Sequence, residues 1–253
     1  MDEHHMRLLI DLHENANRQG PGGDQETRLA IVLSGLAQQK NLKIADIGCG
    51  TGASACVLAE QLDAQITAVD FIQEFLDVLD CKARAKGIHG RLKTLQASME
   101  ALPFPDEALD AIWSEGAIYN MGFERGVSEW RRFLKPGGVL AVSEITWLTD
   151  ERPQRVQTHW QKEYPEIDTA SAKIKILEQN GFTILGYFPL PGRCWVENYY
   201  APLESRFADF LRLHNNSLEA EAIVKAERDE IALYKAYNAY FGYGYYIAKK
   251  LTD

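Results

Sequence analysis

The chain reads Asp46-Ile47-Gly48-Cys49-Gly50-Thr51-Gly52 between a β-type run that ends at Ile47 and a helical pattern that begins near Thr51. Glycines let the backbone turn tightly and approach a ligand closely. Free amides at the start of a helix favour an anionic group such as a carboxylate or phosphate. This order of strand, turn and helix predicts a cofactor site at the turn, although a glycine-rich turn alone does not identify the cofactor.

A second motif follows one strand later, where Asp70 closes the run Ile66-Thr67-Ala68-Val69-Asp70. An acidic side chain at the tip of the second strand sits where the ribose hydroxyls of a bound nucleoside would lie, and it accepts their hydrogen bonds. The two motifs together predict a ligand that contains adenosine or a similar nucleoside. The alternative interpretation is that Asp70 caps the following helix.

Around these motifs, β-type runs and amphipathic helical patterns alternate, which predicts a parallel sheet covered by helices on both faces. The expected fold class is therefore α/β, with a doubly wound, Rossmann-like sheet. The predicted strands cover residues 42–47, 65–70, 92–96, 109–114 and 139–145. The predicted helices among them cover residues 51–62, 71–86 and 124–134.

The segment before this core predicts an N-terminal cap over residues 1–23, in which a short helix precedes the irregular loop Arg18-Gln19-Gly20-Pro21-Gly22-Gly23. Residues 24–253 are expected to form one domain. A helix should begin there with Asp24 as its N-cap. Its apolar stripe predicts a buried face made of Leu29, Val32, Leu33 and Leu36.

Within that domain we expect a core at residues 40–148 and substrate-side additions at 149–181 and 189–242. The predicted elements of the last hundred residues are helices at 153–164, 171–179 and 217–237, strands at 182–188 and 243–249, and an aromatic loop at Cys194–Tyr200. The late aromatic residues, among them Tyr199, Tyr200 and Tyr243, either wall an apolar or cationic acceptor pocket or serve as core packing.

Composition limits the classes of partner. The 253 residues carry a net charge of −9 without a long basic block, which argues against nucleic acid or an anionic membrane as the main partner. We find no apolar run of about 18 residues, and the polar start of the chain is unlike a secretory signal, so we expect a cytoplasmic protein. The four scattered cysteines predict reduced thiols, and no Cys or His spacing predicts a metal site.

Five motifs in fixed order resemble the successive motifs of class I S-adenosylmethionine-dependent methyltransferases, most closely the small-molecule group labelled type 11. They are Asp46–Gly52, Val69-Asp70, Ala97–Phe104, Leu109–Ser114 and Leu134–Gly138. The resemblance covers roughly residues 40 to 148. It implies a seven-stranded sheet of order 3-2-1-4-5-7-6 with the last strand antiparallel, and the run Tyr243–Lys249 is the candidate for that strand.

The resemblance also implies that S-adenosyl-L-methionine is the cofactor and S-adenosyl-L-homocysteine its product, and it implies a role for each motif residue. The implied contacts are Asp46, Gly48 and Gly50 with the methionine end, Asp70 with the ribose, Ser98 and the Met99 backbone with the adenine, Phe71 or Ile72 over the ring, and Glu115 beside the transferred methyl group. One departure is Ser98, where many relatives carry Asp. A hydroxyl still reaches the adenine amino group, but its neutral hydrogen bond is weaker than a charge-assisted one.

The front loop resembles a subgroup in which an Arg-Gln-Gly-Pro-Gly stretch folds over the cofactor. This resemblance implies that Arg18 pairs with the methionine carboxylate, a geometry that suits a guanidinium group. The alternative is that Arg18 is merely solvated.

Methyl transfer from a sulfonium is an in-line displacement, in which alignment and exclusion of water supply most of the rate. A hydroxyl or ammonium acceptor would also need a base. The candidates are Glu115, Tyr119, Glu144 and His159, and each has a structural alternative as an ordinary partner of its neighbours. The expected partner is a small-molecule acceptor, which the sequence does not identify, and the chain is expected to be a monomer or a homodimer.

Three other functions compete with this interpretation. A nicotinamide dehydrogenase is disfavoured because the glycines run GxGxG with Ala53 in the next place, and no hydride-transfer dyad is evident. A non-catalytic S-adenosylmethionine-binding protein would show the same pocket motifs, because fold does not fix function. Methylation of tRNA or protein is disfavoured by the acidic composition and the lack of a basic extension.

Overall fold

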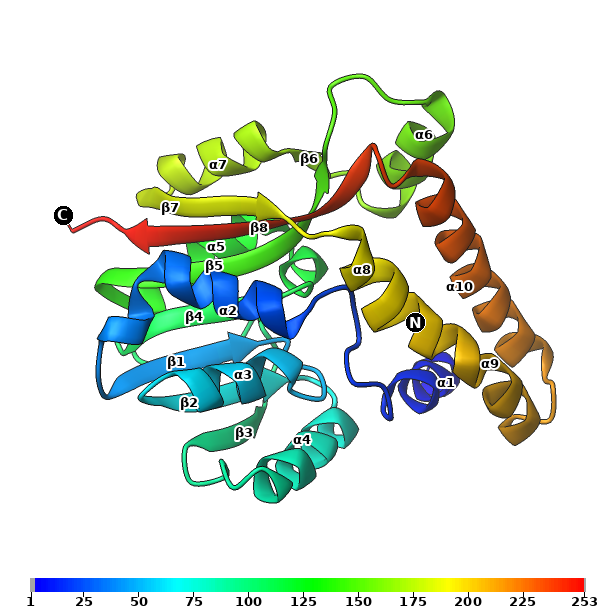
Figure 1. Ribbon diagram of the computed structural model, residues 1–253, viewed down its shortest axis with the longest axis horizontal. Helices are drawn as coiled ribbons and strands as arrows, with labels where there is room; N and C mark the ends of the chain where they lie inside the picture. The colour runs from blue at the N-terminus through cyan, green and yellow to red at the C-terminus, as the bar shows by residue number, and fades with distance from the viewer. Residues whose placement is uncertain (1–2, 253) are drawn as a thin grey trace.

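The computed structural model describes residues 3–252, so Met1, Asp2 and Asp253, at the edges of the predicted segments, lie outside the described residues. Seven strands run through one sheet in the order β3-β2-β1-β4-β5-β8-β7 (Figure 1). Counted along the chain without the two-residue strand β6, this is the predicted order 3-2-1-4-5-7-6. Strand β8 is antiparallel to both of its neighbours, as expected, so the predicted α/β class and topology are confirmed.

The main strands are β1 (Leu42–Ile47), β2 (Ala64–Asp70), β3 (Leu92–Gln96), β4 (Leu109–Glu115), β5 (Leu134–Trp147), β7 (Phe182–Pro189) and β8 (Phe241–Lys250). The short strand β6 (Asp168–Thr169) pairs with the end of β5. The helices that pack on the sheet are α2 (Asp24–Ser34), α3 (Ala53–Gln61), α4 (Gln73–Ala85), α5 (Phe123–Trp130) and α7 (Ala170–Gln179). The short 3-10 helices are η1 (Leu36–Gln38), η2 (Ile118–Asn120) and η3 (Arg131–Phe133).

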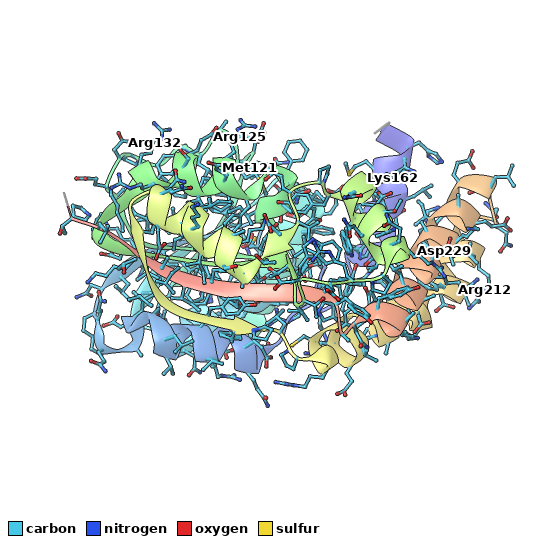
Figure 2. All side chains as sticks on the ribbon, turned by 90° about the horizontal axis from the view of Figure 1, so that it is seen from above. Met121, Arg125, Arg132, Lys162, Arg212 and Asp229 are labelled. Atoms are coloured by element: carbon cyan, nitrogen blue, oxygen red, sulfur yellow. The ribbon has the colours of Figure 1, made fainter. Side chains whose placement is uncertain are left out.

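Helices cover both faces of the sheet, because alternate strand residues point to opposite sides. Ile44 packs into the core beneath α2, α3 and α4, whereas its neighbour Ala45 packs into the core beneath α5 and α7. Figure 2 shows these layers from above, with α2 on one side of β8 and α7 on the other. In the same view charged side chains such as Arg125 and Asp229 extend from the periphery.

The register of the parallel strands brings acidic residues to one edge of the sheet. Asp46 near the end of β1 lies opposite Ala68 in β2, and Glu115 at the end of β4 lies opposite Ser143 in β5. Because the carboxyl ends of parallel strands share an edge, Asp46, Asp70 and Glu115 all lie where doubly wound sheets bind their ligands.

A group of helices forms a cap beside that edge, on the right of Figure 1. It consists of α1 (Glu3–His13), α6 (Gln154–Glu163), α8 (Gly192–Trp195), the π-helix η4 (Val196–Tyr200), α9 (Ala201–Leu213) and α10 (Leu218–Tyr237). Helix α1 packs against α9 and α10, so segments from the two halves of the chain meet in the cap. In residues 3–252 no helix combines the length and apolar character that crossing a membrane requires.

Three local predictions were wrong in whole or in part. The expected aromatic loop Cys194–Tyr200 is helical, because its rings are buried against α10, with Trp195 stacked on Tyr234 at a centroid distance of 4.5 Å. The predicted apolar stripe Leu29, Val32, Leu33 and Leu36 is buried only in part. Val32 is 70% exposed and Leu29 is exposed, whereas Leu33 packs against the core and Leu36 is buried.

The buried face of α2 is made instead of Glu26, Thr27, Ala30, Ile31 and Ser34. Ala30 and Ser34 on this face are small, and α2 packs against β7 and β8. The N-cap of α2 is Gly23 without a side-chain bond, so Asp24 is not the cap.

Candidate functional site

The glycine turn after β1 has a backbone that only glycine adopts readily. Gly48, Gly50 and Gly52 have φ values of +72°, +53° and +84°. The amides of Gly48 and Cys49 both donate to the carbonyl of Val69, at 2.8 and 3.0 Å, which fixes the turn against the end of β2. A Cβ atom on Gly48 would lie 2.3 Å from the Cβ of Ala117, so this position has no room for a side chain.

Asp70 braces the same turn. Its Oδ2 accepts the amide of Gly50 at 2.8 Å and its Oδ1 accepts the amide of Ile72 at 3.0 Å. Burial raises the pKa of this carboxyl group, and the backbone hydrogen bonds oppose the shift. The alternative interpretation of Asp70 as a helix cap is wrong, because α4 has Ile72 as its N-cap without a side-chain hydrogen bond, and the amide that Asp70 accepts there is that of Ile72 itself. Each oxygen keeps a further lone pair for a ligand hydroxyl.

A cavity of about 510 Å³ opens beside the turn, and we call it the turn cavity. The predicted cofactor residues that line it are Gly48, Gly50, Asp70, Phe71, Ile72, Ser98 and Met99. Phe71 is 69% exposed at its rim, free to cover a flat ligand. The Ser98 hydroxyl accepts the amide of Glu100 at 3.2 Å, and the Met99 carbonyl accepts the indole N–H of Trp130 at 3.1 Å.

Asp46 lies beneath the turn and is fully buried. Its Oδ2 accepts the hydroxyl of Ser54 at 2.6 Å, while its Oδ1 has no hydrogen-bond partner among the described residues. Burial raises the pKa of Asp46 to about 7, against the lowering effect of Ser54. The structure does not place Asp46 on the wall of the turn cavity, so its predicted contact with the methionine end stays a prediction.

Gln19 was not predicted from the sequence as a site residue. Its side chain forms hydrogen bonds that hold the front loop against the glycine turn. Its Oε1 accepts the amide of Thr51 at 2.8 Å, and its Nε2 donates to the carbonyls of His13 and Ala16 at 3.1 and 3.3 Å. A Cβ atom on Gly50 would lie 2.3 Å from Gln19 Oε1. The middle glycine of the turn is therefore constrained by this chain's own loop as well as by any ligand.

Arg18 reaches the end of β4 from the front loop. Its Nη1 donates to Glu115 Oε2 at 2.9 Å and its Nη2 contacts Asp24 Oδ1 at 3.1 Å. Burial opposes the charge of Arg18, but the two carboxylates together raise its pKa. A small cavity of about 70 Å³ lies here between Arg18, Gly48, Gly50 and Glu115. The side chain predicted to bind a carboxylate thus lies beside the glycine turn.

Four donors converge on Glu115, whose side chain is 7% exposed. Besides Arg18, its Oε1 accepts the hydroxyl of Thr27 at 2.6 Å, the hydroxyl of Tyr245 at 3.0 Å and the indole N–H of Trp113 at 3.1 Å. A carboxylate that accepts four hydrogen bonds is fixed in place, and most of its lone pairs are occupied. This arrangement favours a positioning role for Glu115 over that of a base.

The other candidate bases lie in different places. Tyr119 in η2 lines the turn cavity and is 41% exposed. His159 lies on α6, edge-on to Trp160 at 5.1 Å, and is absent from the walls of both cavities at the turn. Glu144 is fully buried, and its Oε1 contacts Lys173 Nζ at 3.2 Å. Burial raises the pKa of Glu144 to about 7.

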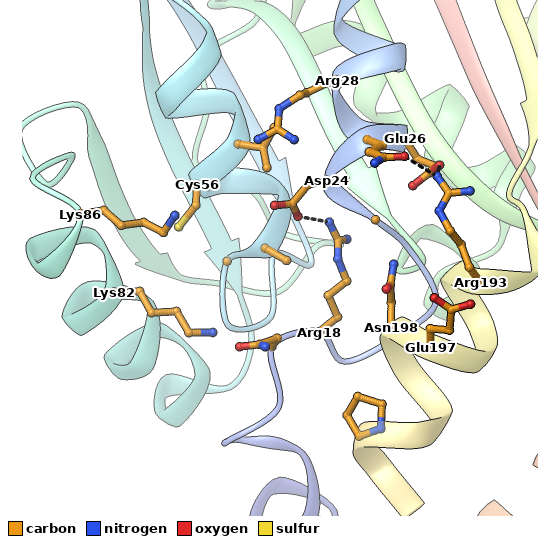
Figure 3. Close-up of a pocket in the computed structure, with 17 residues that line it drawn as sticks. Arg18, Asp24, Glu26, Arg28, Cys56, Lys82, Lys86, Arg193, Glu197 and Asn198 are labelled. Carbon is orange, nitrogen blue, oxygen red and sulfur yellow. Dashed lines mark hydrogen bonds and ion pairs between the residues drawn. The ribbon is translucent and has the colours of Figure 1, made fainter.

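A third cavity, of about 720 Å³, lies on the far side of Arg18 (Figure 3). Its labelled side chains are mostly charged, and Figure 3 shows Arg18 directed at Asp24 and Arg193 directed at Glu26. Although this cavity is larger, it lacks Asp70 and the walls that could enclose a nucleoside. The turn cavity therefore remains the candidate cofactor site.

The comparisons with known proteins bear on this geometry. Residues 45–142 match the family model described as a methyltransferase domain. Residues 45–142 therefore resemble a methyltransferase domain in sequence, and the chain as a whole shares its fold with solved methyltransferase structures. The family match includes the glycine turn and Asp70, and it ends in β5 before the cap helices that follow.

Individual relatives resemble the methyltransferase domain to different extents. The demethylmenaquinone methyltransferase of Thermus thermophilus is 38% identical over 113 residues, which cover 44% of this chain and 50% of that protein. A methyltransferase structure from Geobacter sulfurreducens in complex with S-adenosyl-L-homocysteine has a TM-score of 0.82 at 16% identity, with 96% and 97% of the two chains covered. The [4+2]-cyclase SpnF has a TM-score of 0.75 at 22% identity, with 98% and 93% covered.

The chain spans half or less of the length of the curated relatives it matches. Structures at these identities show a shared fold. The match to the family model, at residues 45–142, includes the glycine turn and Asp70 on the wall of the turn cavity.

Proposed function

We propose that this protein is an S-adenosyl-L-methionine-dependent methyltransferase that acts on a small molecule. The observation that carries the proposal is the joint position of Asp70 and the glycine turn on one wall of a cavity of about 510 Å³. The family match and the structural neighbours support the same conclusion. Nothing in the comparisons favours the alternatives of tRNA or protein methylation.

The residues of the turn cavity fit such a cofactor. The Gly48 backbone cannot carry a Cβ atom, Asp70 has lone pairs left for two hydroxyls, and Phe71 is exposed at the rim. In our proposal Asp70 binds the ribose, Ser98 and the Met99 amide bind the adenine, and Phe71 and Ile72 cover the ring. Arg18 binds the methionine carboxylate through the donors that Glu115 and Asp24 leave free.

When bound, the cofactor supplies an electrophilic methyl group. The contribution of the chain is to hold the acceptor in line and to exclude water from the site, which can supply most of the rate. Glu115 serves to fix Arg18, Trp113 and Tyr245 around the site, and Tyr119 faces the same cavity. We assign no general base from these contacts.

The proposal is tested by calorimetric titration with S-adenosylmethionine, S-adenosylhomocysteine and NAD in parallel, followed by transfer of labelled methyl groups to a panel of small acceptors. Binding of the two sulfur nucleosides without NAD, together with labelled product, is the expected result. Transfer must be measured separately from binding, because the fold is shared with a [4+2]-cyclase. Binding without any transfer would favour the non-catalytic alternative, and binding of NAD alone would overturn the cofactor.

A further inference from the structure

Acidic and aromatic side chains meet under the cap, next to the turn cavity. This cap cluster consists of Tyr199 and Tyr200 from η4, Glu227 and Glu230 from α10, and Tyr243 from β8. The carboxylates lie one helical turn apart on α10, and Tyr234, on the next turn, is buried, so this face of the helix points inward. The function proposed above does not use any of these residues.

The two carboxylates are only partly satisfied by the protein. Glu230 Oε1 accepts the hydroxyl of Tyr200 at 3.0 Å. Glu227 Oε1 lies 3.7 Å from His13 Nε2, while its buried Oε2 has no hydrogen-bond partner among the described residues. Burial and the charge of Glu227 raise the pKa of Glu230 to about 7. A pair of buried carboxylates costs free energy unless cations compensate them.

Among residues 3–252, the basic side chain that acts on both carboxylates is a histidine. His13, which stacks on Tyr199 at a centroid distance of 6.5 Å, is the basic group paired with Glu227, and it is charged only when protonated. The other neighbours that act on Glu230 and Tyr199 are tyrosines and carboxylates. Aromatic faces beside uncompensated carboxylates attract cations, because the ring face and the carboxylate both carry negative potential.

Tyr243 connects the cap cluster to the turn cavity. Its side chain is 9% exposed, and its hydroxyl forms no hydrogen bond within residues 3–252. Its ring lies over Gly116, where a Cβ atom would be 2.9 Å from Cε2 and 3.6 Å from the hydroxyl oxygen. Gly116 lines both cavities at the glycine turn. The hydroxyl lies within electrostatic range of Tyr119 and Glu230. A hydroxyl that makes no hydrogen bond to the described residues and lies between the two regions can donate to a ligand.

We propose that the cap cluster binds a cationic nitrogen of the methyl acceptor, such as a protonated amine. Glu227 and Glu230 supply the counter-charge, Tyr199 and Tyr243 supply aromatic walls, and the Tyr243 hydroxyl offers a hydrogen bond on the side of Gly116. This inference rests on the proposed function, because it names the substrate class of that same site. It does not specify which atom of the acceptor is methylated.

The test uses two probes of equal size, benzylammonium and benzyl alcohol, titrated into the full chain with and without S-adenosylhomocysteine and followed by NMR. Benzylammonium should bind at least ten times more tightly than the alcohol. Equal affinities, or no binding of benzylammonium at millimolar concentration, would overturn the proposal. Failure of S-adenosylhomocysteine to bind in the same samples would count against the proposed function instead, so the two failures are distinguishable.

Substitutions on α10 test whether benzylammonium binds at the cap cluster. Glu230→Gln should weaken benzylammonium binding about tenfold and leave S-adenosylhomocysteine binding unchanged. Glu221→Gln removes the same charge from an exposed position on α10 and should change neither. Glu227→Gln provides a second variant should Glu230→Gln fail to fold by circular dichroism. Wild-type affinity for benzylammonium in a folded Glu230→Gln or Glu227→Gln protein would place the amine elsewhere and defeat the assignment.

Discussion

The guanidinium of Arg18 donates to the carboxylate of Glu115 over 2.9 Å, joining residues 97 positions apart in the chain. One partner belongs to the front loop and the other ends β4. Because Glu115 is also held by Thr27, Trp113 and Tyr245, its position is fixed and that of Arg18 follows from it. The closed front loop and the ligand site are therefore parts of one hydrogen-bonded unit.

Arg18→Lys should weaken S-adenosylhomocysteine binding by about ten- to a hundredfold, which corresponds to roughly 1.5–3 kcal/mol for a hydrogen bond to a charged group. The charge is kept, but an ammonium group cannot span Glu115 and Asp24 and also bind a carboxylate in a fork. Calorimetry measures the effect. Arg28→Lys is the matched control, because Arg28 is exposed and lies outside the cavities at the turn. Equal affinity in both variants would show that Arg18 is only structural.

Asp70→Ala should reduce cofactor affinity by one to two orders of magnitude, about 1.5–3 kcal/mol for the loss of charge-assisted hydrogen bonds. The same change removes the acceptor of the Gly50 and Ile72 amides, so a small loss of stability should accompany it. Asp77→Ala removes an exposed carboxylate from α4 and serves as the comparison. Unchanged affinity for S-adenosylhomocysteine in a folded Asp70→Ala protein would disprove the ribose assignment.

Gly50→Ala and Gly87→Ala form a matched pair at positive φ. Gly87 has a φ of +70° and no atom within 4 Å of the place that an added methyl group would take, so its substitution should cost only the backbone penalty of about 1–2 kcal/mol. Gly50→Ala should cost more and abolish cofactor binding, because its Cβ atom meets Gln19 Oε1 at 2.3 Å. Urea unfolding and calorimetry measure the two effects. Unchanged cofactor affinity of Gly50→Ala would mean that the glycine turn or Gln19 moves to make room for the added methyl group.

Asp46 should make the protein less stable as the pH rises. Its folded pKa of about 7 lies above its ordinary value of 3.8, so between these values the folded state holds a proton that the unfolded state has released. The free energy of unfolding therefore falls with rising pH through this window. For this one group the fall is on the order of 2–4 kcal/mol, since one unit of pKa corresponds to about 1.4 kcal/mol.

Asp46→Asn removes this dependence. The variant should be more stable than the wild type at pH 7.5 and nearly equal to it at pH 4.5, as measured by urea unfolding at both pH values. Asp63→Asn, at an exposed position between α3 and β2, should leave the difference between the two pH values unchanged. If Asp46→Asn shows the wild-type difference, then Asp46 is ionised in the folded protein.

The sequence motifs predicted those parts of the site whose residues lie close together in the chain. The glycine turn and Asp70 were predicted as site residues because each stands at the end of a β-type run. The resemblance to the family pattern predicted the antiparallel strand at Tyr243–Lys249. The four donors to Glu115 were not predicted as a set. Thr27 and Tyr245 lie 88 and 130 positions away, and no periodicity within one segment records such a contact.

The wrong predictions have a physical cause in the tertiary structure. Val32 has the spacing of a core residue, but α2 packs on the sheet through the side that carries Ala30 and Ile31, so Val32 faces outward. The segment Cys194–Tyr200 was predicted as a loop because it has no clear helical period, yet the ring of Trp195 packs on α10 and β8, and the segment is helical. In both cases packing outweighed the local signal.

The insertion of β8 between β5 and β7 makes the order of synthesis important. The ribosome releases Arg18 and the glycine turn early, whereas Tyr245 emerges only after about two hundred further residues have been made. Until then β5 and β7 have no strand between them, and their unpaired edges are open to other chains. A nascent chain can thus hold a complete glycine turn without the bond from Tyr245 that helps to fix Glu115, so we expect it to depend on chaperones until its last strand is released.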